Sequence, residues 1–340
     1  MDLKHLCFSL AEKCGTSGDE KEAVCYSAEL LSKYMNTQTE RLGNVRGTMG
    51  EGSVHILLDA HIDQIGMVVR AIDEKGFLLV DKVGGMDLRV LTGAEVIVHA
   101  KHKLFGVICS VPPHLQKGDK KESLDIKTMA VDIGYDKETA ESLVEIGDRI
   151  TLRCVSHEML GDKISSSAFD DRCCVAAILR ALELTHNKLH NIRVSVLFST
   201  QEETSGSGAK TGAFSLMPDY AIAVDVGFGD DAYTDKTQTI KLGAGPSIGI
   251  SPTLDREFTN ELIDIAKSRN IPYQHDVMGG RTGTNADSIN ITGCGVKTAL
   301  LSVPLRYMHT ANEVISLKDV ENTAQLIAEY LFKKEAEYNA

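Results

Sequence analysis

The chain has 340 residues, of which 43% are hydrophobic and 25% are charged, and its formal net charge is −12. The negative charge argues against a nucleic-acid partner, which would need a basic patch. No apolar stretch approaches the roughly 18 residues that cross a membrane. The first residues show an amphipathic helical pattern rather than a signal peptide. The length predicts one large domain and a smaller one.

The eight cysteines are scattered through apolar contexts, and none belongs to a CxxC pair. A chain of this size without a secretion signal is not expected to use a disulfide framework. We therefore expect reduced, mostly buried thiols and a cytoplasmic protein. A cysteine nucleophile at Cys173 or Cys174 is a minor alternative.

The first 65 residues predict the start of an α/β layer. Residues 2–37 predict two helices on either side of the sequence GTSGDE. Residues 44–50 have hairpin turn chemistry, and residues 53–63, SVHILLDAHID, follow as a buried strand.

Residues 66–159 differ from their surroundings, because short runs rich in β-branched residues alternate there with turn signals. This pattern is typical of a small barrel or sandwich. Helix–strand alternation resumes after it. The predicted fold class is therefore α/β, with a sheet-and-helix domain formed by residues 1–65 and 160–340 and a small β-barrel-like domain inserted at 66–159.

Acidic and histidine side chains recur where the predicted strands of the larger domain end, and one aspartate lies at the start of a helix. These residues are His61, Asp63, Asp170, Glu202, Glu203, Asp225 and His309. Ligands of open α/β sheets bind at the strand ends. Histidines and carboxylates that converge there have the composition of a paired divalent-metal site.

His61 and Asp63 point the same way if the strand continues, since alternate residues share a face. A carboxylate in that place can orient an imidazole ligand or its metal. Structural alternatives exist for most candidates, such as helix capping for Asp170. Asp225 is harder to explain, because an aspartate in an apolar run is costly unless it is paired or metal-bound. The residues alone leave a metal hydrolase and a structural interpretation open.

Five motifs in order resemble those of the dinuclear metallo-aminopeptidases of the TET and glutamyl-aminopeptidase family, some members of which are labelled cellulase M. The motifs are LLDAHIDQIGMVV, AFDDR, STQEETSGSGA, AVDVG and VPLRYMHTANEV. The resemblance covers nearly the whole chain, including the inserted β domain. It implies a metal-dependent aminopeptidase that removes N-terminal residues from short peptides.

The resemblance also implies a role for each candidate. Asp170 would bridge two metal ions, of which His61 and Asp225 would complete one ligand set. Glu203 and His309 would complete the other. Asp63 would orient His61, and Glu202 would be the general base on water. The ions would be zinc or cobalt, with manganese as a further option.

The resemblance further implies a homo-oligomer, because the inserted domain of such relatives mediates dimerisation and their dimers assemble into hollow dodecamers. The sequence departs from the family at ISSS before AFDDR and at Asn285, where a closely similar loop often has aspartate. These departures bear on specificity. Arg281 and Arg306 have two interpretations, contact with a substrate carboxylate or a structural ion pair.

Three other functions are open. The first is a two-metal deacylase that acts on a non-peptide substrate. The second is a glycoside hydrolase, which usually needs no metal and tends to use aromatic platforms, whereas this chain has no tryptophan. The third is a catalytically silent binding protein. The presence of every expected metal ligand argues against this function. The preferred N-terminal residue is not predicted.

Overall fold

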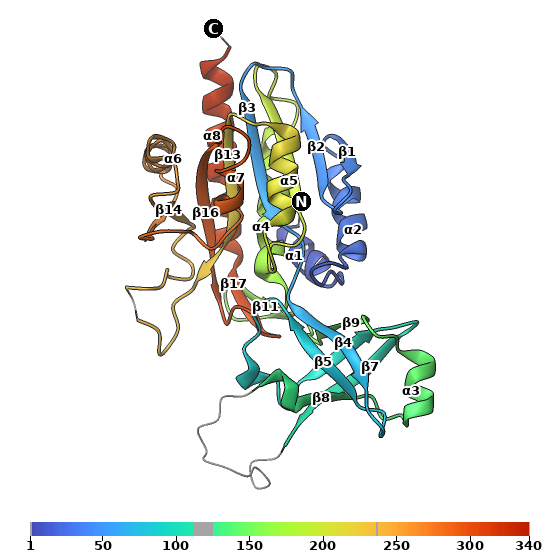
Figure 1. The fold of residues 1–340 in the computed structure, drawn as a ribbon. Coiled ribbons are helices and arrows are strands. Elements are labelled where there is room, and N and C mark those ends of the chain that lie inside the picture. Colours follow the sequence, from blue (N-terminus) through green and yellow to red (C-terminus); the bar gives the residue numbers. More distant parts are fainter. Residues whose placement is uncertain (1, 112–124, 236, 340) are drawn as a thin grey trace.

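The computed structural model describes residues 2–111, 125–235 and 237–339. An eleven-stranded mixed sheet forms the centre of the larger part (Figure 1). Its main path runs in the order β1 (Asn36–Thr39), β2 (Val45–Met49), β12 (Arg193–Ser199), β3 (His55–His61), β13 (Tyr220–Phe228), β16 (Lys297–Arg306), β17 (Glu313–Ser316), β11 (Lys163–Ser166) and β10 (His157–Glu158). β14 (Ser247–Ile250) pairs with β16, and β15 (Gln274–Val277) pairs with β14.

The four central strands, β12, β3, β13 and β16, are parallel to one another. Every residue of β3 is buried, as expected for a strand covered on both faces. Because parallel strands end at the same edge of a sheet, the residues that follow these four strands gather there.

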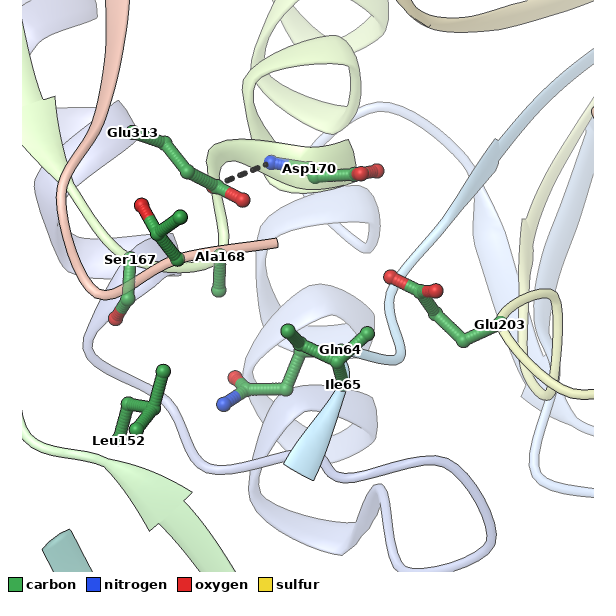
Figure 2. Close-up of a pocket in the computed structure, with 9 residues that line it drawn as sticks. Gln64, Ile65, Leu152, Ser167, Ala168, Asp170, Glu203 and Glu313 are labelled. Atoms are coloured by element: carbon green, nitrogen blue, oxygen red, sulfur yellow. Dashed lines mark hydrogen bonds between the residues drawn. The ribbon is translucent and has the colours of Figure 1, made fainter. Parts of the chain in front are cut away.

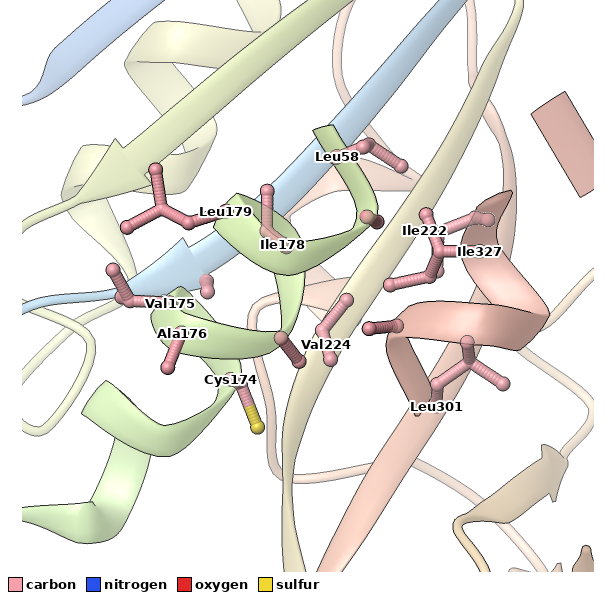
Figure 3. Close-up of a cluster of buried hydrophobic side chains, with 14 of the residues drawn as sticks. Leu58, Cys174, Val175, Ala176, Ile178, Leu179, Ile222, Val224, Leu301 and Ile327 are labelled. Atoms are coloured by element: carbon pink, nitrogen blue, oxygen red, sulfur yellow. The ribbon is translucent and has the colours of Figure 1, made fainter. Parts of the chain in front are cut away.

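Helices cover both faces of the sheet (Figure 1). They are α1 (Leu3–Ala11), α2 (Lys21–Leu31), α4 (Phe169–Thr185), α5 (Ser207–Leu216), α6 (Arg256–Arg269), α7 (Ala286–Ile289) and α8 (Leu317–Glu337). α4 packs against α1, α8 and β3, and almost all of its side chains are buried. Figure 3 shows this core, in which Leu179 of α4, Leu58 of β3 and Ile327 of α8 belong to one cluster of buried side chains. The core holds the start of α4 beneath the strand ends.

A closed antiparallel barrel forms the smaller part (Figure 1). Its strands close in the order β4 (Gly66–Ile72), β5 (Leu78–Val83), β8 (Met129–Asp132), β7 (Lys103–Ser110), β6 (Glu95–His99) and β9 (Arg149–Leu152). The short helical segments η1 (Leu88–Val90), η2 (Ile126–Thr128) and α3 (Lys137–Leu143) connect them. Met67, Val96 and Ile150 are fully buried in a separate hydrophobic core, and closure leaves the barrel without free edges.

The predicted fold class, α/β with a small barrel-like unit, is confirmed. The domain boundaries at residues 66 and 159 stay a prediction. The last barrel strand ends at Leu152, and β10 already pairs with β11 of the main sheet. None of the helices in the described ranges combines the length and the hydropathy that a membrane crossing requires.

Candidate metal centre

The residues predicted for the site come together at the carboxyl edge of the central strands. His61 is the last residue of β3, and Glu202 and Glu203 follow β12 after a short turn. Asp225 lies level with His61, because Ala223 of β13 pairs with Asp59 of β3, two residues earlier in each strand. The chain then adds His309 beyond β16 and Asp170 at the start of α4.

Two groups of potential ligands share Asp170. In the first, ligand atoms of His61, Asp170 and Asp225 all lie within 4.8 Å of one another. In the second group, ligand atoms of Asp170, Glu203 and His309 also lie within 4.8 Å of one another. Asp170 Oδ1 lies 3.1 Å from His61 Nε2, and its Oδ2 lies 3.3 Å from His309 Nε2. One carboxylate therefore faces two imidazoles, a donor set that fits two adjacent divalent cations.

The pKa values of the cluster reflect its burial and its charges. Burial raises the pKa of Glu202 to about 9 and that of Asp225 to about 7. Burial would lower the pKa of His309, but hydrogen bonds with Asp170 and Glu203 outweigh it and raise the pKa to about 11. The pKa of His61 is raised well above its usual value despite burial, because Asp170 and Asp63 lie beside the ring. Such a concentration of buried carboxylates is costly unless cations compensate it.

Asp63 holds the turn that carries the adjacent glutamates. Its Oδ1 accepts a hydrogen bond from Glu202 N–H at 3.0 Å, and its Oδ2 accepts one from Glu203 N–H at 3.2 Å. The chain turns at Gln201, whose φ is +60°. Adjacent side chains would diverge in a regular strand, but this turn lets Glu202 and Glu203 face the same cleft. Asp63 Oδ1 also lies 3.5 Å from His61 Nδ1.

Two further buried acids, Glu313 and Asp171, hold the backbone of candidate ligands. Glu313, at the start of β17, accepts hydrogen bonds from Asp170 N–H at 3.1 Å and from His309 N–H at 3.0 Å. Figure 2 shows the bond to Asp170 beside a small cavity. Asp171 accepts a hydrogen bond from His61 N–H at 3.0 Å. Asp171 lies in the motif AFDDR and Glu313 in the motif VPLRYMHTANEV, so closeness in sequence to a candidate ligand was the available signal for both.

A cleft of about 680 Å³ opens beside the ligands. Its lining includes Phe228, Met278 and the loop at 281–284. Gly85 of the barrel part also lines it, and a Cβ there would lie 3.1 Å from His309 Nδ1. The barrel therefore closes one side of the centre, and a side chain at position 85 would crowd the ring of His309.

The two arginines discussed from the sequence lie in ion pairs. Arg306 pairs with Asp230 at 2.8 Å. Arg281 lies 3.4 Å from Asp287, lines the cleft and keeps 84% of its side chain exposed. A structural interpretation therefore suits Arg306, whereas Arg281 remains accessible from the cleft.

Comparisons with known proteins agree with this geometry. The model of the M42 glutamyl aminopeptidase family matches residues 43–326. A lysyl aminopeptidase from Pyrococcus furiosus is 30% identical over 84% of this chain and 84% of its own length.

Solved structures give the same result. A TET aminopeptidase from a marine sediment archaeon of the Thaumarchaeota superposes with a TM-score of 0.92 at 28% identity, over 99% of this chain and all of the other. The TET1 peptidase of Pyrococcus horikoshii, described as assembling into a tetrahedron or a large octahedral shell, superposes with a TM-score of 0.86 at 30% identity, over 97% of this chain and 99% of the other. The chain therefore belongs to the M42 glutamyl aminopeptidase family and is a peptide hydrolase.

Proposed function

We propose that this protein is a metal-dependent aminopeptidase that releases N-terminal residues from short peptides with two divalent ions and Glu202 as the general base. The observation that carries the proposal is the position of Asp170. One of its carboxylate oxygens faces His61, which belongs to the first ligand group, and the other faces His309, which belongs to the second. His61, Asp170 and Asp225 would hold one ion, and Asp170, Glu203 and His309 the other. Zinc or cobalt suits these donors, and manganese is a further option.

The bound ions would supply the polarisation of the scissile carbonyl and the acidification of water that two-metal hydrolases use. The other steps fall to the protein. Glu202 Oε2 lies 3.9 Å from His61 Nε2 and lines the cleft. Burial raises the pKa of this carboxyl group to about 9 without metal, and bound cations would lower that pKa. The ionised group can then take a proton from water and pass it to the leaving amine. Asp63 keeps Glu202 in place through the backbone and orients His61.

We propose that the protein works as a homo-oligomer, with residues 66–159 as an inserted dimerisation domain, and that a dodecamer of the TET type is one assembly it can form. The assemblies described for the TET1 peptidase of Pyrococcus horikoshii support an oligomer. All eight cysteines are free, which supports a cytoplasmic location. If the active sites face the interior of such a hollow assembly, short peptides would enter more easily than folded proteins, which would favour short peptides as substrates.

The proposal is tested with protein stripped by a chelator and then supplied with zinc, cobalt or manganese. We expect the stripped protein to be inactive on a panel of aminoacyl-p-nitroanilides, and metal to restore release from one class of residue. Undiminished hydrolysis without metal would contradict the metal requirement. No hydrolysis by protein that binds two equivalents would contradict the aminopeptidase assignment, and blocked amides would then test deacylation.

The variant Glu202→Gln should keep both metals and lose turnover by about 10³-fold, because an amide cannot accept the proton from water. Metal content and kcat on the best substrate of the panel are the measurements. Glu158→Gln, an exposed change of the same kind, should leave both unaltered. Near-normal kcat in Glu202→Gln would remove this residue as the base.

The variant Glu313→Gln should weaken metal binding by about 10- to 100-fold, as is usual when the partner of a ligand is removed. Its side-chain amide can accept from Asp170 N–H or His309 N–H but would turn a donor toward the other. Titration with a competing chelator measures the affinity, again beside Glu158→Gln. An affinity equal to that of the unmodified protein would show that Glu313 does not support the ligands.

Metal binding should release protons, and the apparent affinity should fall as the pH is lowered. His61 and His309 have raised pKa values without metal, so both rings carry a proton at neutral pH that a cation must displace. Calorimetry in two buffers with different ionisation enthalpies measures the release. Equal binding heats in the two buffers would contradict the expectation.

A further inference from the structure

A second buried polar cluster lies next to the metal ligands without belonging to either ligand group. Asn285 Nδ2 donates a hydrogen bond of 2.9 Å to Asp59 Oδ2 and one of 2.8 Å to Ser199 Oγ. All three side chains are buried. They come from β3, from the end of β12 and from the residue before α7, so the cluster joins segments that are up to 226 residues apart.

The cluster connects the strand that carries a ligand to a wall of the cleft. Asp59 precedes His61 by two residues and therefore shares its face of β3. Asn285 directly follows Thr282, Gly283 and Thr284, which line the cleft. Because the amide of Asn285 bonds to two strands, it holds the end of this loop against the sheet.

The chemistry of the cluster demands a donor at position 285. Asp59 Oδ2 accepts the hydrogen bond of the Asn285 amide, so the donor at position 285 satisfies one of the two buried carboxyl oxygens. Asp59 Oδ1 and Asn285 Oδ1 have no hydrogen-bond partner among the residues that the structure describes. An aspartate at position 285 would remove this donor and place a second buried carboxyl group beside Asp59, and two such groups cannot both ionise without a large cost.

We propose that Asn285 is a positioning residue, matched to Asp59, that fixes the loop at 281–284 as the peptide-binding wall of the cleft. The inference rests on the proposed aminopeptidase function for its effect on peptide binding. The loop lines the cleft, and none of its residues belongs to the two ligand groups found among the described residues. Its displacement should therefore raise KM for peptides and leave metal content intact.

A double-mutant cycle that exchanges the aspartate and the asparagine between positions 59 and 285 tests the pairing. Asn285→Asp should raise KM by about tenfold or more, the cost of an unpaired buried polar group. The double variant Asp59→Asn, Asn285→Asp places a donor opposite an acceptor again and should recover most of this loss. Asn285→Ala, which removes the donor without repulsion, covers the case in which Asn285→Asp fails to fold. Asn260→Asp repeats the same change at an exposed position of α6 and should not alter KM.

Hydrogen exchange of the peptide that spans 278–286 gives a readout that does not depend on activity. We expect about tenfold faster exchange in Asn285→Asp and in Asn285→Ala, with recovery in the double variant and no change in the barrel. Additive effects in the cycle, or a loss of metal and kcat at unchanged KM, would overturn the proposal. If the unmodified protein hydrolyses no peptide, the proposed function fails, while the exchange cycle still decides whether the pair positions the loop.

Discussion

The carboxylate of Asp170 lies between His61 and His309, at 3.1 and 3.3 Å from their Nε2 atoms, and the rest of the site depends on this arrangement. A single acid placed between two imidazoles ties the two candidate ligand groups into one centre. The fold must also supply hydrogen-bond donors to this carboxylate, because it is buried with several other carboxylates. The parallel sheet meets this demand by delivering the ligands to one edge.

The supporting bonds come largely from acids that hold the backbone of the candidate ligands and of Glu202. Asp63 accepts from the N–H groups of Glu202 and Glu203, and Glu313 from those of Asp170 and His309. Glu313 joins the start of α4 to the segment that follows β16, and Asp63 joins the segment after β3 to the turn at Glu202 and Glu203. A displacement of one segment would therefore disturb a ligand from another strand, which explains how loops that follow different strands can hold a site with ångström precision.

The barrel and the sheet have separate hydrophobic cores, yet both contribute to the cleft. Gly85 reaches the ring of His309 from the barrel side, whereas the loop at 281–284 forms a wall on the sheet side. In our proposal the barrel also mediates assembly, so contacts between subunits would lie close to substrate binding. The hydrogen bonds of Asn285 to Asp59 and Ser199 tie the end of this loop to the sheet.

Local patterns in the sequence were sufficient for the fold class, since the change from helix–strand alternation to short β-branched runs marks the barrel. They were also sufficient to select the candidate ligands, because an apolar strand that ends in His61 or passes through Asp225 is visible in a few residues. Which acids support these ligands was decided only by the tertiary structure. Glu313 meets Asp170 across 143 residues, and Asn285 meets Asp59 across 226. No periodicity within one segment encodes such contacts, because they depend on the order and register in which distant strands pair.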